Sequence, residues 1–281
     1  MPLRPDWPFD VRRLPFFYGW MIWLLSTLGF LFSIPGQTMG MAVFTDPFIE
    51  VMGLGRTELS LAYLVGTVGS SLFLTRAGRW YDRLGGRAMV ALASLALAAM
   101  LMFISSVDHI SEALGGGAFV AFSCMLLGYF GVRFFGQGVL TSASRNVLLV
   151  WFERRRGLVS SARGVFVSLG FSLAPLMLAA MIATTGWRAS LWLLALACTA
   201  FGLVALLLLR NHPEECGVRV DGHSADTGDA PTQIIPSATL AEARRSPVFW
   251  IASLSLSMHS LFGTAVTFHI VSIFDAAGRP Q

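Results

Sequence analysis

The stretch that decides the fold is Gly78-Arg79-Trp80-Tyr81-Asp82-Arg83-Leu84-Gly85-Gly86-Arg87, a short basic segment between two long apolar runs. The runs cover residues 59–75 and 88–107. Each is long enough to cross a hydrocarbon layer of about 30 Å as an α-helix, which rises about 1.5 Å per residue. We therefore expect two membrane-spanning helices joined by a turn at residues 78–87, where glycines allow the helix ends to approach closely.

The composition extends this expectation to the whole chain. Of its 281 residues, 55% are hydrophobic and only 13% are charged, and the mean hydropathy is +0.66. Apolar runs that can span a bilayer lie at residues 16–41, 59–75, 88–107, 118–150, 158–185, 189–209 and 248–274. The first run is too long for a cleaved signal peptide and lacks a convincing cleavage site, so we expect it to remain as a span. The sequence predicts an all-α membrane protein with seven spans.

The basic residues are distributed unevenly between the two sides of these spans. All 20 are arginines. When the spans are threaded in order, three arginines fall on the side opposite the N-terminus: Arg56, Arg188 and Arg279. Fourteen fall on the side of the N-terminus: Arg4, Arg12, Arg13, Arg76, Arg79, Arg83, Arg87, Arg154, Arg155, Arg156, Arg210, Arg219, Arg244 and Arg245. Because cytoplasmic loops carry the excess of arginine, we expect a multi-pass protein of the plasma (inner) membrane with a cytoplasmic N-terminus. A protein that binds nucleic acid would instead gather its basic residues on one soluble face.

The chain divides into three predicted regions. Residues 1–210 form a six-span bundle, residues 211–246 are a polar cytoplasmic linker, and residues 247–281 hold a seventh span. The six-span block consists of two sets of three, each with a long first helix and a glycine-rich second one. This layout is found in the inverted repeats of secondary transporters.

Several short motifs resemble those of one protein family. The pattern G-x-x-x-D-R-x-G-x-R at residues 78–87, between the second and third spans, resembles the signature of the major facilitator superfamily of secondary transporters. Other segments are similar to the bacterial monocarboxylate and oxalate/formate branch of that superfamily. They are FYGW at 17–20, WFERRRG at 151–157, GWR at 186–188 and SPVFW at 246–250.

The resemblance implies a fold of twelve spans in two pseudo-symmetric halves. We therefore expect this sequence to hold the six-helix N-terminal bundle and the first span of a C-terminal half that is otherwise missing. A complementary C-terminal half would then be a partner, together with the lipid bilayer. The resemblance also implies that the motif acts as a conformational latch through Gly78, Asp82, Arg83, Gly85 and Arg87.

The strongest candidate for substrate binding is Arg133, near the middle of the fourth run. A charge at this depth is costly unless it faces a cavity or a partner, and the carboxylates of the first six spans all lie at span ends or in loops. At about 100° per residue, Gln137, Leu140 and Ser144 share its helix face. We interpret Arg133 as an anion anchor that faces a central cavity and holds a carboxylate. The alternative is a structural arginine bound to backbone carbonyls.

Two further polar residues are candidates for contact with substrate. Gln37 follows the kink signal Pro35-Gly36, and its amide either faces the cavity or bonds a neighbouring helix. His269 lies inside the seventh span. Proton coupling would use His269, a carboxylate in the missing half, or a proton bound together with the anion on Arg133.

Two more arginines lie nearer the cytoplasmic ends of their spans. Arg145 and Arg163 are each one to two turns from such an end. We expect them to reach the interface or to pair with loop carboxylates such as Glu153.

The sequence contains no arrangement typical of an enzyme, a cofactor site or a metal site. No glycine-rich phosphate loop ends in Lys-Ser/Thr, and His212 and Cys216 lack a second pair of zinc ligands. The sequence therefore predicts a secondary transporter of a small organic anion, a monocarboxylate, that works by alternating access. The rival predictions are a drug or metabolite exporter of the same superfamily and a truncated membrane protein that does not transport.

Overall fold

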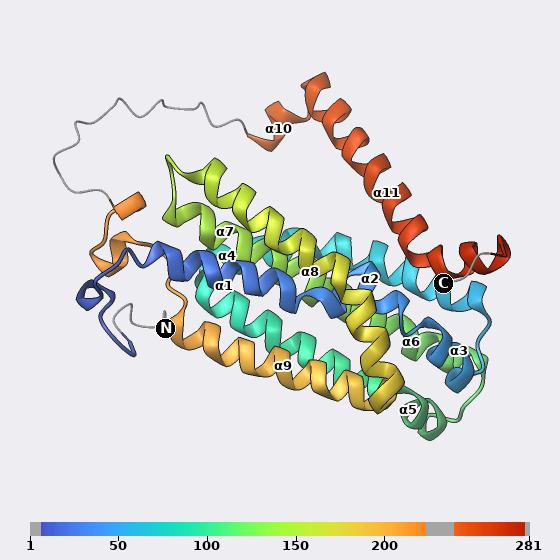
Figure 1. Cartoon of the computed structure of the whole chain (residues 1–281). Helices are drawn as coiled ribbons and strands as arrows, with labels where there is room; N and C mark the ends of the chain where they lie inside the picture. Colours follow the sequence, from blue (N-terminus) through green and yellow to red (C-terminus); the bar gives the residue numbers. More distant parts are fainter. Residues whose placement is uncertain (1–6, 223–238, 279–281) are drawn as a thin grey trace. The chain divides into compact units, whose positions relative to one another are not determined.

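A computed structural model describes residues 7–222 and 239–278, and every regular element in these residues is helical (Figure 1). The chain forms two compact units, Met1–His223 and Ser224–Gln281, which we describe separately. The first unit contains nine α-helices within its described residues: α1 Gly19–Phe32, α2 Thr38–Ala42, α3 Thr45–Met52, α4 Arg56–Ser105, α5 Val107–Ala113, α6 Ala118–Val132, α7 Thr141–Trp151, α8 Arg156–Thr185 and α9 Trp187–Leu208. It also contains a π-helix, η3 Arg133–Leu140, and short 3₁₀ turns at Val11–Arg13, Ile34–Gly36 (η2), Glu214–Cys216 and Val220–Gly222. The second unit contains α10 Leu240–Ala243 and α11 Pro247–Ala276.

The helices account for the predicted spans. Within the described residues, five segments are long and apolar enough to cross a membrane: α4, the continuous stretch Ala118–Trp151, α8, α9 and α11. Helix α4 is 50 residues long and contains two of the predicted spans, and α1 is a shorter apolar helix. The all-α membrane fold is thereby confirmed. In the first unit, α4 packs along α9, α6 and η3, and α1 packs against α7 and α8 (Figure 1).

The turn between the second and third spans is shorter than predicted. Helical backbone continues through residues 78–84, and only Gly85, with φ 78° and ψ 162°, leaves the helical region. A side chain at Gly85 would meet the Asn211 amide, with its Cβ 2.6 Å from Nδ2. The turn predicted at residues 78–87 is therefore concentrated at Gly85, whose positive φ interrupts the helical backbone.

The predicted first span is also interrupted. The run 16–41 is not one helix, because α1 ends at Phe32 and η2 separates it from α2. Pro35 lies in η2 and Gly36 follows it, which is the kink that this pair predicts.

Side chains complete the end of α9, two of them from distant segments and one from Arg210, just after the helix. The last helix carbonyls have no intrahelical partner. Here the Leu206 carbonyl accepts from Arg87 Nε at 2.7 Å, that of Leu207 from Arg210 Nη1 at 2.8 Å, and that of Leu208 from the Tyr18 hydroxyl at 2.6 Å. The two guanidinium groups also place positive charge at the negative end of the helix dipole.

Part of the predicted linker packs onto the first unit. Cys216 and Asp221 are buried, and Asp221 Oδ2 accepts from the backbone N–H of Glu153 at 3.1 Å and of Arg154 at 2.7 Å. Residues 211–222, the first part of the linker predicted at 211–246, therefore bind the bundle through the side chains of Asn211 and Asp221. Residues 223–238 lie outside the described residues.

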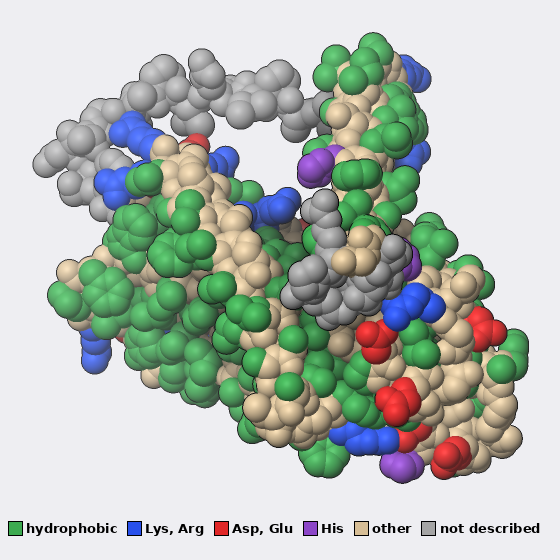
Figure 2. Space-filling view, turned by 45° about the vertical axis from the view of Figure 1, so that its right-hand side comes forward, with side chains coloured by type: hydrophobic (Ala, Val, Ile, Leu, Met, Phe, Trp, Pro, Cys, Tyr) green, Lys and Arg blue, Asp and Glu red, His purple; other side chains and the backbone are tan. Residues whose placement is uncertain are grey.

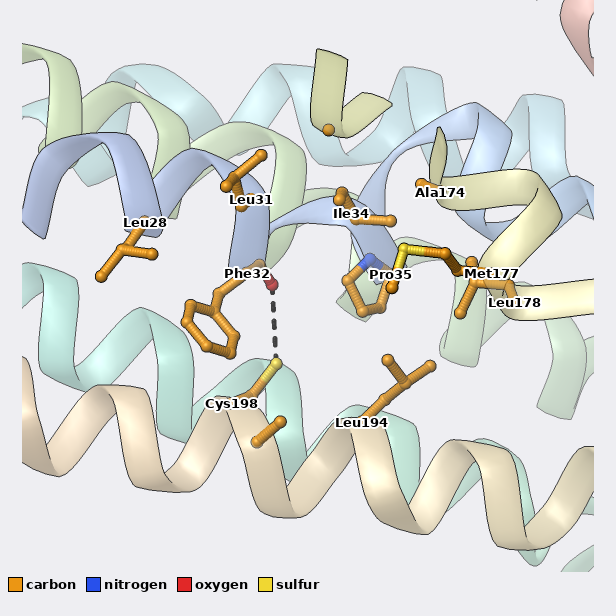
Figure 3. A pocket seen from close by; sticks show the side chains of 12 residues that line it. Leu28, Leu31, Phe32, Ile34, Pro35, Ala174, Met177, Leu178, Leu194 and Cys198 are labelled. Carbon is orange, nitrogen blue, oxygen red and sulfur yellow. Dashed lines mark hydrogen bonds between the residues drawn. The ribbon is translucent and has the colours of Figure 1, made fainter. Parts of the chain in front are cut away.

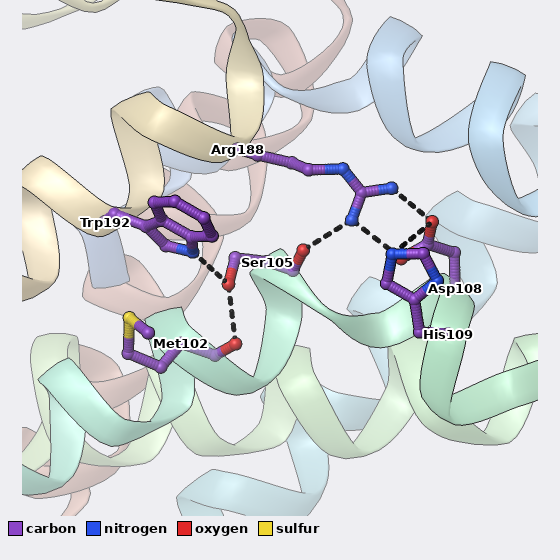
Figure 4. Close-up of polar contacts among 6 residues, drawn as sticks. All are labelled: Met102, Ser105, Asp108, His109, Arg188 and Trp192. Atoms are coloured by element: carbon purple, nitrogen blue, oxygen red, sulfur yellow. Dashed lines mark hydrogen bonds and ion pairs between the residues drawn. The ribbon is translucent and has the colours of Figure 1, made fainter. Parts of the chain in front are cut away.

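The opposite end of the first unit is held by an ion pair between α5 and α9 (Figure 4). Arg188 Nη1 donates to Asp108 Oδ1 at 2.9 Å and to the Ser105 carbonyl at 2.8 Å. This guanidinium keeps the pKa of the Asp108 carboxyl below its ordinary value, chiefly through that hydrogen bond. Asp46 and Arg56 form a second ion pair, between α3 and α4. Several acidic side chains lie together at one end of the face that Figure 2 shows.

The second unit is dominated by α11. Most of its apolar side chains are exposed, among them Ile251, Leu254 and Phe262. A helix that is apolar around its whole circumference is suited to lipid or to a membrane-embedded partner. The structure thus supports the seventh predicted span as a membrane helix by length and composition.

Candidate functional site

Arg133 begins the π-helix η3 and is buried, with only 5% of its surface exposed. Its Nη1 donates to the Gly36 carbonyl at 3.3 Å and to Thr38 Oγ1 at 3.4 Å. The guanidinium carbon also lies 5.2 Å from the centre of the Tyr63 ring, a cation–π distance. Of the two interpretations from sequence, these contacts match the structural arginine bound to a backbone carbonyl. They also show that Arg133 points between α2 and α4.

Two residues of this cluster were not among the sequence candidates. Tyr63 donates to Thr38 Oγ1 at 3.0 Å, and its ring meets the edge of the Tyr129 ring, with centroids 5.2 Å apart. Tyr129 is fully buried, and its hydroxyl has no hydrogen-bond partner among the described residues. The chain has four tyrosines, and these two lie inside apolar runs, which is the signal that could have identified them.

The cluster depends on a close approach of two backbones. A Cβ added to Gly36 would lie 2.7 Å from the Cα of Gly136, so only glycine at both positions lets η2 touch η3. Gln37 is nearly buried beside this contact, and its Nε2 donates to Ser33 Oγ at 3.0 Å. The Gln37 amide thus bonds within its own segment.

The polar stripe predicted along the fourth span is wrong in its membership. Arg133 and Ser144 are buried, whereas Gln137 is exposed. The physical reason is the π-helix, whose i→i+5 bonds widen the turn and rotate the following residues away from the α-helical alignment. Sequence reasoning assumed one continuous α-helix.

The structure instead shows a different polar stripe on the same segment. Every exposed residue of η3 and α7 is polar: Gln137, Ser142, Arg145 and Asn146. By contrast, the exposed faces of α4 and α8 carry large apolar residues such as Leu72 and Leu176. Ser142 and Asn146 also border a cavity of about 150 Å³ that reaches Gly78 and Tyr81 of α4. We call Gln137, Ser142, Arg145 and Asn146 the polar stripe.

The residues predicted as a latch fall into two groups. Gly78, Asp82 and Arg83 are exposed on α4. Gly85 forms the chain reversal, and Arg87 is only 2% exposed, because its side chain donates to Leu206 and to the Trp7 carbonyl. Arg87 therefore acts within the bundle and is not available as a surface latch, while the role of the exposed residues stays a prediction.

An apolar pocket of about 340 Å³ lies between α1, α8 and α9 (Figure 3). Leu28, Phe32, Pro35, Met177 and Leu194 point into it. Cys198, the most polar side chain in the lining, donates weakly to the Phe32 carbonyl at 3.5 Å. The lining offers no charged group.

His269, the remaining sequence candidate, belongs to the second unit. It lies in α11, half-buried, with its ring centroid 5.2 Å from that of Phe268. Asp275, near the end of this helix, has a side chain outside the described residues.

These features define a class: a multi-pass α-helical membrane protein with broken helices and one exposed polar face on an otherwise apolar bundle. The model of the Major Facilitator Superfamily matches residues 113–278, more than half of the chain. The chain belongs to the major facilitator superfamily, a family of transporters rather than enzymes. No curated protein matches this sequence significantly. The match covers η3, α7 and α11 but not the motif at residues 78–87.

Proposed function

We propose that the protein is a secondary transporter of small organic anions of the monocarboxylate class, working by alternating access. The observation that carries the proposal is the polar stripe of η3 and α7. A charged or amide side chain exposed to lipid costs several kcal/mol, so such residues line a water-filled path or a bundle interior. The stripe contains a cation, Arg145, and no carboxylate.

A buried charge near the polar stripe also favours a negatively charged substrate. Arg133 lies four residues before Gln137 and forms no ion pair among the described residues. A positive charge that no carboxylate neutralises attracts an anion in a medium of low dielectric. The geometry thus supports a substrate with a carboxylate rather than an amine.

The direct test is uptake of labelled pyruvate into vesicles that contain the purified full chain. Uptake above that of protein-free vesicles is expected. Asn146→Leu, which makes the stripe apolar, and Arg133→Ala should each lower it about tenfold or more, whereas Arg155→Gln, which removes an exposed arginine at the start of α8, serves as the matched control. Equal uptake in all variants would remove both residues from the mechanism.

The apolar pocket favours a second candidate, an exporter of apolar compounds. Its volume of about 340 Å³ lies within the range of small-molecule pockets, and its lining is apolar apart from Cys198. Ala174→Trp would fill it. Loss of transport of an apolar dye in this variant, with pyruvate uptake absent throughout, would favour the exporter. Unchanged dye transport would exclude the pocket.

The orientation in the membrane is part of the proposal. We place the N-terminus in the cytoplasm of a plasma (inner) membrane, because fourteen arginines fall on its side of the predicted spans and three on the other. Gly115 and Trp80 are both exposed and lie at opposite ends of predicted spans. In intact cells, an impermeant maleimide should label Gly115→Cys and not Trp80→Cys, and the reverse pattern would invert the orientation.

The last part of the proposal concerns the coupling of transport to protons. The described residues of α11 hold two histidines, His259 and His269, and only His269 is shielded. A bound anion raises the affinity of a nearby imidazole for a proton. If His269 couples transport, His269→Gln should abolish the dependence of pyruvate uptake on a pH gradient while His259→Gln preserves it. Unchanged pH dependence in both would leave His269 a packing residue.

A further inference from the structure

We propose that Arg145 and Arg163 together bind one oxyanion group, a carboxylate or a phosphate, within the cytoplasmic half of the bundle. Arg145 lies six residues before the end of α7, and Arg163 lies seven residues after the start of α8. At about 1.5 Å per residue, both are about 10 Å from the helix ends that the α7–α8 loop joins. The two arginines are therefore at the same depth.

The pair is a concentration of positive charge without a counter-ion. Ser26, which bonds the carbonyl beside Arg145, and Phe30, which contacts Arg163, lie about one turn apart on α1, and the charge of Arg145 acts on Arg163. Arg163 Nη1 is buried and has no hydrogen-bond partner among the described residues. Glu153, the partner expected from sequence, forms no ion pair in the described part of the chain, and its backbone N–H bonds to Asp221. Two like charges at this depth are costly, and one anion between them removes much of that cost.

Helix α1 contacts both helices that carry the two arginines. The Arg163 guanidinium carbon lies 4.6 Å from the centre of the Phe30 ring. On the other side, Ser26 donates to the carbonyl of Ser144, the neighbour of Arg145 in α7, at 2.8 Å. One helix thus contacts both α7, beside Arg145, and α8, at Arg163.

The direction of Arg163 argues against simple extension to the interface. Leu31 contacts Gly170, so this part of α1 is level with α8 about two turns beyond Arg163. The guanidinium contacts the adjacent residue, Phe30, and therefore lies along the bundle instead of reaching back to the end of α8. A long basic side chain that only needed water would take the shorter route.

The site is distinct from Arg133. Arg145 follows Arg133 by twelve residues, about 18 Å along a helix, and Arg133 is turned toward α2 and α4. Two guanidinium groups offer several N–H donors to one carboxylate or phosphate. The idea that the transported substrate occupies this site rests on the proposed function. Anion binding itself does not, because it can be measured without transport.

The test measures thermal unfolding of the purified full chain in nanodiscs of phosphatidylcholine, titrated with pyruvate and, separately, with inorganic phosphate. A ligand that binds the folded protein raises the midpoint with concentration. We expect the apparent Kd to rise about tenfold or more in Arg145→Gln and in Arg163→Gln. Arg163→Lys should lose less, and Arg155→Gln, which removes the exposed arginine at the N-cap of the same helix, should bind as the parent does. If Arg163→Gln does not fold, the test uses Arg145→Gln alone, because Arg145 is exposed.

A second arm uses nanodiscs that contain phosphatidylglycerol. Stabilisation by free pyruvate or phosphate that needs both arginines identifies a soluble anion. Stabilisation by phosphatidylglycerol alone, again lost in both variants, identifies a lipid headgroup in the same site. The proposal is overturned if Arg145→Gln and Arg163→Gln match Arg155→Gln in every arm. Arginine-dependent binding without pyruvate uptake would reject the proposed function and leave this site standing.

Discussion

Arg87 Nε donates a hydrogen bond to the carbonyl oxygen of Leu206 at 2.7 Å, and so joins the turn after the second span to the end of the sixth. The backbone N–H of Arg87 in turn donates to Asn211 Oδ1 at 2.8 Å. One arginine thus ties three segments that are far apart in sequence. Arg87, one residue of the predicted latch, thus has a structural task inside the bundle.

Arg87→Gln should destabilise the protein by about 2–4 kcal/mol, because a buried charged donor and its carbonyl partners are lost together. The unfolding midpoint in detergent measures this. Arg83→Gln is the control, since Arg83 is exposed on the same helix and should lose less than about 0.5 kcal/mol. Equal midpoints for the two variants would contradict the role assigned to Arg87.

Gly85→Ala should cost about 1–3 kcal/mol, because φ of 78° is unfavourable for alanine and the new Cβ would meet the Asn211 amide. Gly78→Ala is the matched control from the same motif, since a Cβ at Gly78 meets nothing within 4 Å. There the substitution should be neutral or stabilising, because alanine favours the helix. Comparable losses at both positions would show that the reversal is not centred on Gly85.

The ion pair of Asp108 and Arg188 should make stability fall in acid. Arg188 lowers the pKa of Asp108 below its ordinary value of 3.8 in the folded state. The contribution is therefore complete above pH 3.8 and is lost as the pH falls through the lowered pKa.

Asp108→Asn should lose about 1–2 kcal/mol at neutral pH and should approach the parent in acid. Asp46→Asn is the control, because the side chain of Asp46 is 66% exposed, and its ion pair contributes little. Unfolding midpoints from about pH 1.5 to pH 7 separate the two cases, because the contribution is lost only below pH 3.8. A constant difference between parent and Asp108→Asn across that range would refute the assignment.

Asp221→Ala should open the loop between α7 and α8, since Asp221 Oδ2 accepts from the backbone N–H groups of Glu153 and Arg154. Its φ of 60° also disfavours alanine, whereas asparagine tolerates this conformation and keeps an acceptor oxygen. Amide hydrogen exchange at residues 153 and 154 should accelerate in Asp221→Ala and change little in Asp221→Asn. Unchanged exchange in both would mean that the loop is held by other contacts.

The sequence by itself determined the spans, the break at Pro35-Gly36 and the reversal near Gly85. These depend on local properties, namely apolar length, the missing amide of proline and the positive φ that glycine tolerates. Only the tertiary structure decided which way the polar side chains point. The π-helix places Gln137 on a different face from Ser144. The Arg133 side chain donates to the carbonyl of Gly36. Asn211 and Asp221 accept from the backbone N–H groups of Arg87 and Arg154, which are 124 and 67 residues away. Such pairings depend on how the helices pack, which no local pattern encodes.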